Sequence, residues 1–344
     1  MELTTVDPRD EQAFDAWFAV LQAVERDARP DEFGHTSQEV RAAALTGSGP
    51  DPDSAVVLLA ATLDGAVVGA ARLDLPRRDN LHLAEVEVGV HPLARRRGVG
   101  RALVAELERR MRADGRTSAI GYTDEPPGRP SAMTQGAAQA LGCAWTQEEA
   151  RRDIDLPLPS QAARALEAGC QAYARDFEIL TWRDVAPEHL LDDLAVLHQR
   201  MSTDVPMADL DITEEAFDAA RVRRHEQLAR DMGRVVFGAG AVHRPTGRMT
   251  AYTDQAVLIE APERVYQWNT IVLTEHRGHR LGTLVKLACL RRLSQEVPAA
   301  RFISTWNALE NTAMIRVNDA LGARVNGHVV AWQKRLPRSA DRDG

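Results

Sequence analysis

The sequence predicts an α+β protein (α/β in some schemes) of two consecutive domains, each with a mixed central sheet flanked by helices. Three observations lead to this fold class. The length of 344 residues suits two cores of about 150 residues each. Helical and strand patterns alternate along the chain. A glycine-containing turn between an extended stretch and a helix occurs twice, as RRRGVG at 95–100 and RGHRLG at 277–282.

The two turns belong to an internal repeat. Aligning Arg95 with Arg277 gives an offset of 182 residues, and AAQALGCAW at 137–145 resembles IRVNDALGARV at 315–325 at an offset of 180. Two landmarks in the same order at nearly the same spacing indicate a duplicated unit. The prolines of LPLPS break regular structure between the copies. We therefore expect domains at 1–155 and 177–338, joined by a connector at 156–176.

The elements of the first copy follow from its residue pattern. Apolar residues recur at helical spacing in three stretches, and they alternate or run continuously in shorter ones. The pair Asp64-Gly65 between two apolar runs predicts a hairpin turn. This gives helices at 10–28, 98–114 and 131–141, a hairpin at 55–75, and strands at 82–90 and 117–123.

The second copy reads in the same way, after a connector helix at 161–174. Its last helix ends at a glycine, which is a common helix stop. The acidic residues Asp211 and Glu214 suit the start of a helix near Ile212, where they complement the helix dipole. The prediction is helices at 187–201, 213–232 and 310–322, another from Leu281, a hairpin at 233–259, and strands at 264–273 and 302–307.

Composition narrows the class of function. The net charge of −8 disfavours nucleic acid as the main partner and leaves cationic small molecules open. Apolar runs such as AVVLLAA are far shorter than the roughly 20 residues that cross a bilayer, and the start MELTTVDPRD lacks signal-peptide features. The three cysteines are far apart and lack metal-binding spacing. We expect a cytoplasmic protein with reduced thiols, no metal and no membrane partner, as a monomer or homodimer.

Both glycine turns stand at the N-terminus of a helix, where the first backbone N–H groups lack intrahelical partners and the dipole is positive. Gly98 and Gly100 lack the Cβ atoms that would keep a bulky anion away. The turn therefore suits a phosphate, although a tight turn with solvated arginines is the plainer alternative. The candidate contacts are Arg95, Arg96, Arg97, Gly98, Val99, Gly100 and Arg101.

A strand, then R-x-x-G-x-G opening a helix, then a strand and a helix ending in L-G, resembles the GNAT acetyltransferase superfamily. The two copies are similar in layout to the tandem, mycothiol synthase-like enzymes of actinobacteria. The first copy carries the full pyrophosphate motif, whereas the second has Arg280 where the middle glycine is usual. The resemblance implies acetyl-CoA as co-substrate. By position it implies further contacts from Val88, Val90, Val272, Arg277, Gly278, His279, Arg280, Leu281, Gly282, Asn307 and Asn311.

In this family the strand before the glycine turn splays from its neighbour, and a carboxylate on it often deprotonates the amine. Glu85 and Glu87 alternate onto one face of the first such strand. Glu87 is our candidate general base, although a solvated strand face would explain both residues. Alignment at the second turn places Asn269 opposite Glu87, and an amide cannot take a proton at neutral pH. The tyrosine that the family often uses as acid is replaced by Ala138 and Asn318.

These features favour an acyltransferase that moves acetyl from acetyl-CoA to a primary amine of a small, cationic molecule. The alternative is an acyl-CoA-binding regulator without turnover, and a nucleic-acid module is disfavoured by the acidic balance. The segment 201–218 is strongly acidic and has no basic residue. We expect it to border the acceptor site, with Asp204 and Asp209 contacting the amine through their charge.

Overall fold

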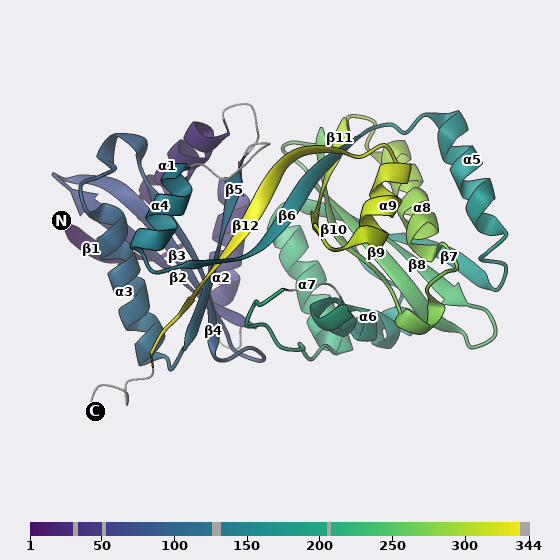
Figure 1. The fold of residues 1–344 in the computed structure, drawn as a ribbon, viewed down its shortest axis with the longest axis horizontal. Coiled ribbons are helices and arrows are strands. Elements are labelled where there is room, and N and C mark those ends of the chain that lie inside the picture. The colour runs from purple at the N-terminus through teal and green to yellow at the C-terminus, as the bar shows by residue number, and fades with distance from the viewer. Residues whose placement is uncertain (30–33, 50–52, 126–131, 205–207, 338–344) are drawn as a thin grey trace. The chain divides into compact units, whose positions relative to one another are not determined.

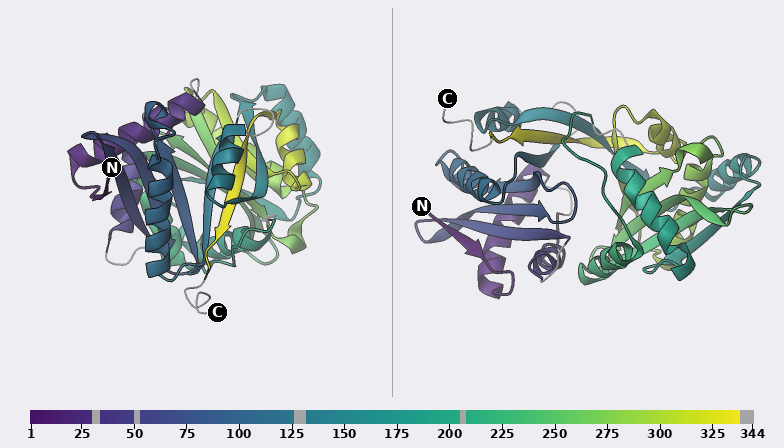
Figure 2. Two further views of the ribbon diagram at one scale, coloured as in Figure 1. Left: turned by 60° about the vertical axis from the view of Figure 1, so that its left-hand side comes forward. Right: turned by 90° about the horizontal axis from the view of Figure 1, so that it is seen from below.

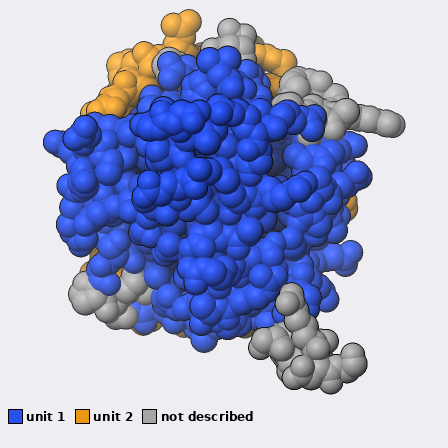
Figure 3. Space-filling view, turned by 90° about the vertical axis from the view of Figure 1, so that its left-hand side faces the viewer, with its two compact units in different colours: residues 1–148, 208–213, 328–344 blue, residues 149–207, 214–327 orange. Residues whose placement is uncertain are grey.

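The computed structural model describes residues 1–29, 34–49, 53–125, 132–204 and 208–337 (Figure 1). The chain has the mixed helix and sheet architecture that the sequence predicts. It divides into two compact units, coloured separately in Figure 3. Unit 1 comprises Met1–Glu148, Ala208–Thr213 and His328–Gly344, and unit 2 comprises Glu149–Met207 and Glu214–Gly327.

Unit 1 consists of the first copy of the repeat and the last strand of the chain. Its elements are β1 (Glu2–Val6), α1 (Glu11–Ala28), α2 (Ser37–Gly47), β2 (Ser54–Leu63), β3 (Ala66–Pro76), β4 (Leu83–Val90), the 3₁₀ turn η1 (Pro92–Ala94), α3 (Val99–Ala113), β5 (Ser118–Glu125), α4 (Ala132–Ala140), and parts of β6 (Ala144–Asp155) and β12 (Arg324–Arg335). The strand order is β1-β2-β3-β4-β5-β12, with β4 and β5 parallel.

The two faces of this sheet are covered by different helices (Figure 2). Helix α1 is capped by Asp10, whose side chain accepts a hydrogen bond from the Ala13 amide, and it packs with α2 on alternate residues of β2 and β3. Trp17 anchors α1 because its Nε1 donates to the Leu59 carbonyl at 2.9 Å. Helix α3 covers the opposite face with the apolar side chains of Leu103, Leu107 and Met111. Strand β4 therefore lies in a sheet that is covered by helices on both faces.

Unit 2 repeats this layout. Its elements are the rest of β6, α5 (Ser160–Gln171), β7 (Phe177–Arg183), the 3₁₀ turn η2 (Glu188–Leu190), α6 (Leu191–Asp204), α7 (Ala219–Asp231), β8 (Arg234–His243), β9 (Arg248–Leu258), β10 (Arg264–Val272), the 3₁₀ turn η3 (Thr274–His276), α8 (Leu281–Glu296), β11 (Phe302–Ala308), α9 (Thr312–Ala320) and the start of β12. The strand order is β6-β11-β10-β9-β8-β7. Helices α6 and α7 pack on one face, and α8 packs on the other beside α5.

The last strand of each copy completes the sheet of the other unit. In unit 1, β5 pairs with β12 from Glu125↔His328 to Ser118↔Arg335. In unit 2, β11 pairs with β6 from Phe302↔Asp155 to Ala308↔Glu149. The compact units are therefore discontinuous in sequence, and the boundaries at 155 and 177 stay a prediction for the repeat.

The segment 208–213 also belongs to unit 1, where its backbone is held by side chains. The Thr213 amide donates to Asn80 Oδ1 at 2.7 Å, and the Asp211 amide donates to Gln333 Oε1 at 2.8 Å. Helix α7 therefore begins at Ala219, with Asp218 as its N-cap. The predicted start near residue 212 was wrong, because the preceding amides bond to unit 1 instead of to helix carbonyls. Across the described residues, no helix has the length and apolarity needed to cross a membrane.

Candidate functional site

In each unit, the two parallel strands before and after the turn-and-helix segment stop pairing part-way along their length. In unit 1, β4 pairs with β5 over Leu83–Glu85 but continues to Val90. In unit 2, β10 pairs with β11 over Arg264–Tyr266 but continues to Val272. The end of each ladder leaves backbone groups on the facing edges for another extended molecule. The family resemblance implied this splayed strand, and the structure confirms it.

The first glycine turn follows η1 and opens α3. Arg96 and Gly98 both have left-handed backbones, with φ of 63° and 83°. Gly98 is the N-cap of α3 and makes no side-chain cap hydrogen bond. A Cβ atom built on Gly98 would meet no protein atom within 4 Å. The space over this helix N-terminus is open, so the residues present fit a phosphate group that approaches the backbone.

The arginines of the first turn have different roles. The Arg95 guanidinium donates to Asp27 Oδ2 at 2.7 Å and to the Val90 carbonyl at 3.4 Å. Arg95 therefore ties the turn to α1 and to the end of β4. The remaining arginine side chains of this turn are exposed and can complement a phosphate charge. They are Arg96, Arg97 and Arg101.

The second turn follows the same backbone path, with two residues in the left-handed region. Its glycine occupies the first of these two positions, whereas the glycine of the first turn occupies the second. Gly278 and Arg280 have φ of 90° and 58°, at the positions of Arg96 and Gly98. A left-handed backbone costs a residue other than glycine about 1–2 kcal/mol. The Arg280 guanidinium lies 5.5 Å from the Tyr173 ring, and the His279 ring contacts the Tyr173 carbonyl at 2.9 Å. The second turn is thus partly occupied by contacts within unit 2.

Glu87 lies on β4 directly across from Arg72 of β3. Its side chain is exposed, as is that of Glu85 on the same strand face. Although part of the Glu87 side chain is exposed, nearby protein atoms keep water away from part of its carboxyl. This desolvation raises the pKa of Glu87 above the ordinary value. The positive charges of His35 and Arg72 oppose this rise. A carboxyl with a raised pKa is better matched to proton transfer near neutral pH.

A histidine–glutamate pair lies near Glu87. His35 Nδ1 is 2.6 Å from Glu25 Oε1, and this hydrogen bond raises the pKa of His35. Thr36 and Glu39 form a capping box at the start of α2, which fixes the backbone beside His35. Sequence reasoning missed this pair because its two residues come from different elements.

Unit 2 places its carboxylate one strand away from the position of Glu87. Asn269 of β10 pairs with Asp254 of β9 at a β-bulge, in the register that Glu87 and Arg72 occupy in unit 1. The backbone N–H of Asn269 donates to Asp254 Oδ1 at 2.7 Å. Burial raises the pKa of Asp254 to about 6, against the hydrogen bonds from Tyr252 and Asn269. Sequence reasoning missed Asp254, and the local signal for it is a single carboxylate within the strand MTAYTDQAVLI.

Residues 17–131 match the sequence model described as the acetyltransferase (GNAT) family. A solved structure described as a tandem GNAT protein from the clavulanic acid biosynthesis pathway, without AcCoA, is 27% identical to this chain. The similarity covers 98% of this chain and 99% of that one, with a TM-score of 0.79. Residues 17–131 thus match the GNAT family, and the chain as a whole is similar in fold to a tandem GNAT protein.

Two further solved structures are similar in fold at lower identity. A GCN5-related N-acetyltransferase from Sphaerobacter thermophilus has 16% identity and a TM-score of 0.63, over 98% of this chain and 96% of that one. A fungal β-N-acetylglucosaminidase with a glucosamine N-acetyltransferase region has 12% identity and a TM-score of 0.65, over 97% of this chain and 38% of that one. A comparison with curated protein sequences gave no match.

The raised pKa of Asp254 leads to a stability prediction. A carboxyl whose folded pKa is raised binds a proton more tightly when folded, so it lowers the stability as pH rises from about 4 to 6. Moving the pKa from 3.8 to about 6 corresponds to about 3 kcal/mol of lost stability at neutral pH. Asp254→Asn should therefore raise the midpoint of thermal unfolding at pH 8 and lose this advantage near pH 4. Calorimetry at both pH values tests this, and a variant that is less stable at pH 8 contradicts it.

The remaining positions implied by the GNAT resemblance contribute backbone or structural contacts. Val99 and Leu281 are buried in the two cores, and Val88, Val90 and Val272 pack against the same cores. Asn311 is the N-cap of α9, where its side chain accepts from the Met314 amide at 3.2 Å. Asn307 accepts a hydrogen bond from Asn318 at 2.6 Å.

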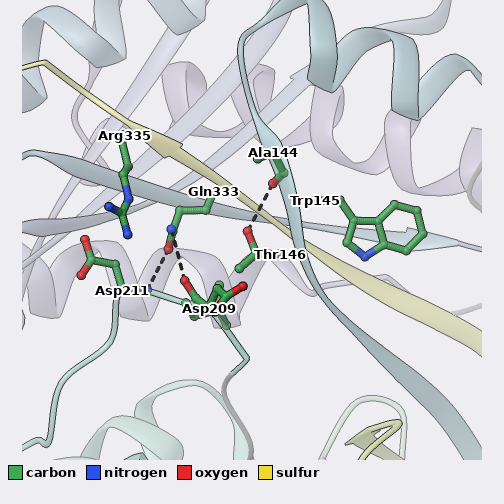
Figure 4. A pocket seen from close by; sticks show the side chains of 8 residues that line it. Ala144, Trp145, Thr146, Asp209, Asp211, Gln333 and Arg335 are labelled. Atoms are coloured by element: carbon green, nitrogen blue, oxygen red, sulfur yellow. Dashed lines mark hydrogen bonds between the residues drawn. The ribbon is translucent and has the colours of Figure 1, made fainter.

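The two acidic residues expected at the acceptor site belong to different units. Asp204 ends α6 and pairs with Arg277 of the second turn at 3.2 Å, as Asp27 pairs with Arg95 in unit 1. Asp209 lines a separate cavity of about 470 Å³ in unit 1 (Figure 4). Its carbonyl accepts a hydrogen bond from Gln333 Nε2 at 3.4 Å. Each residue thus has its own surroundings within its unit, and an amine contact by either stays a prediction.

Two histidines of unit 2 differ in their surroundings. His189 is exposed. His198 is half-buried and stacks on Phe217, in the segment before α7, with ring centroids 5.0 Å apart. Burial lowers the pKa of His198 to about 3, so its ring is neutral.

Proposed function

We propose that this protein is an N-acetyltransferase that moves acetyl from acetyl-CoA to the primary amine of a small cationic molecule. The observation that carries the proposal is the position of Glu87. It stands on the splayed strand β4, in the unit whose glycine turn is open to an anion. The same segment carries the GNAT family match. No metal is required by this chemistry.

Each part of unit 1 has a defined task in this reaction. Acetyl-CoA supplies a thioester whose C–S bond breaks as the amine nitrogen forms a bond to the acetyl carbon. The first turn binds the pyrophosphate through its backbone and exposed arginines. Glu87 takes the proton that the ammonium must lose before it can attack, directly or through water. The departing thiolate can be protonated by water, since a thiol pKa lies near 8.5.

The carboxylate of Glu87 itself would attract a cationic acceptor. The neighbouring carboxylates of Glu25 and Asp74 are paired with His35 and Arg72, and these two cations lower the pKa of Glu87 more than the two carboxylates raise it. We propose that the acceptor binds beside β4 of unit 1, and an amine contact by Asp204 or Asp209 of the acidic segment 201–218 stays a prediction. Electrostatic attraction of this kind weakens as salt screens it.

The test is an assay of free thiol released from acetyl-CoA, with cationic, neutral and anionic primary amines and mass analysis of the products. We expect cationic amines to react fastest and their KM to rise with salt. Equal rates for anionic amines would contradict the cationic acceptor. Acetyl-CoA binding without thiol release for any amine would favour the non-catalytic regulator, which the missing tyrosine at Ala138 and Asn318 also suits.

A further inference from the structure

A lysine is buried in the core of unit 2. Lys286 of α8 is 1% exposed, and burial lowers its pKa to about 7. Its Nζ donates to Asn318 Oδ1 of α9 at 2.6 Å. A charged group in an apolar core costs free energy unless it is well paired. Apolar residues fill the corresponding positions of unit 1, which are Val104 and Ala138.

The lysine begins a chain of three hydrogen-bonding side chains. Asn318 Nδ2 donates in turn to Asn307 Oδ1 of β11 at 2.6 Å. Asn307 lies three residues beyond Ser304, where the pairing of β10 with β11 ends. These three hydrogen-bonded side chains therefore extend from the core of unit 2 to the opening between its splayed strands.

The chemistry of a protonated lysine fixes the orientation of both amides. An ammonium group donates and cannot accept, so Asn318 must turn its oxygen toward Lys286 and its NH₂ toward Asn307. Asn307 must then accept with its oxygen, which leaves its own NH₂ as a donor. Among the described residues, this NH₂ has no hydrogen-bond partner. Without a donor-only group at the start, the two amides could adopt either orientation.

We propose that Lys286 is a positioning residue for a second acyl-CoA site in unit 2, where it orients the Asn307 amide to donate to a carbonyl oxygen of the acyl-CoA. The proposal rests on the acyl-CoA chemistry proposed above. The site differs between the units, because Thr123 stands in unit 1 at the ladder position that Asn307 has in unit 2. The carbonyl is that of the thioester or that of the pantetheine arm.

The test measures acyl-CoA binding by calorimetry and native mass spectrometry at pH 6, where Lys286 is protonated. Lys286→Met and Asn307→Asp should each weaken the binding event of unit 2 by about 5- to 10-fold, the loss expected for one hydrogen bond. The double variant should be no weaker than either single one, since both remove the same contact. The binding event of unit 1 should be unchanged. Comparing acetyl-CoA with free CoA shows whether the carbonyl belongs to the thioester.

Lys286→Gln separates orientation from simple hydrogen bonding. Glutamine can still bond to Asn318, but it can donate or accept and so no longer fixes the amides. A loss of affinity with Lys286→Gln, in a protein that melts as the wild type does, supports the proposal. Wild-type affinity in both Lys286→Gln and Lys286→Met overturns the proposal. The proposal is also overturned if the wild type binds a single acyl-CoA and a variant of the first turn loses it, because unit 2 then has no site. Failure to bind any acyl-CoA overturns the proposed function itself.

Discussion

Replacing Glu87 by Gln should lower turnover with acetyl-CoA and a primary amine by about 10²-fold, as expected for loss of a general base. The affinity for acetyl-CoA should not change, because the first turn that binds the pyrophosphate is intact. The measurement is kcat from thiol release together with the Kd of acetyl-CoA from calorimetry. The wild type should lose activity in acid with an apparent pKa above 4.5, in line with the raised pKa of Glu87.

Glu85→Gln is the matched control for this prediction. Glu85 lies on the same face of β4 and is equally open to solvent, so general surface charge would affect both variants alike. We expect near wild-type turnover in Glu85→Gln. Full activity in Glu87→Gln would move the chemistry to unit 2. Asp254, with its raised pKa, would then be the carboxylate to substitute next.

Gly98→Val should reduce acyl-CoA affinity in unit 1 by at least about 10-fold. Gly98 has a φ of 83°, so a side chain costs about 1–2 kcal/mol of backbone strain. Because a Cβ there meets no protein atom within 4 Å, the side chain would occupy the open space that the pyrophosphate needs. Titration calorimetry with acetyl-CoA measures the loss, and unchanged affinity would remove the first turn from the binding site.

Two matched variants separate strain from blocked binding. Gly115 has a φ of 77° and equally open surroundings, at the other end of α3, so Gly115→Val carries similar strain without touching the first turn. We expect it to lower stability and to leave acyl-CoA affinity unchanged. Arg280→Gly relieves the left-handed backbone of the second turn and should raise stability by about 1 kcal/mol.

Most local structure follows from the sequence. The Asp64-Gly65 pair forms the predicted hairpin turn with both residues at positive φ. Helix α3 begins at Val99, directly after the glycine turn, with its apolar side on the sheet. Such features depend on residues that are close together in the chain, so pattern and turn chemistry are sufficient to predict them.

Features that depend on distant partners could not be predicted. The last strand of each copy, β6 or β12, pairs in the sheet of the other unit, β12 with β5 and β6 with β11. Either strand has a residue pattern that would allow it to pair with β5 or with β11, so the sequence does not decide between them. The Asp254–Asn269 pair depends on the register of β9 against β10. The hydrogen bond between Lys286 and Asn318 depends on how α8 packs against α9. Alignment by the glycine turn located Asn269, but it could not show that the carboxylate had moved to the neighbouring strand.

The measurement that tests the proposed acetyltransferase activity most directly is the formation of acetylated amine, followed by mass spectrometry, with acetyl-CoA and the best cationic amine in large excess over protein. We predict many turnovers for the wild type, release of one thiol for each acetyl group transferred, and about 10²-fold slower product formation in Glu87→Gln. A wild-type protein that binds acetyl-CoA yet forms no acetylated product with any amine would contradict the proposed function.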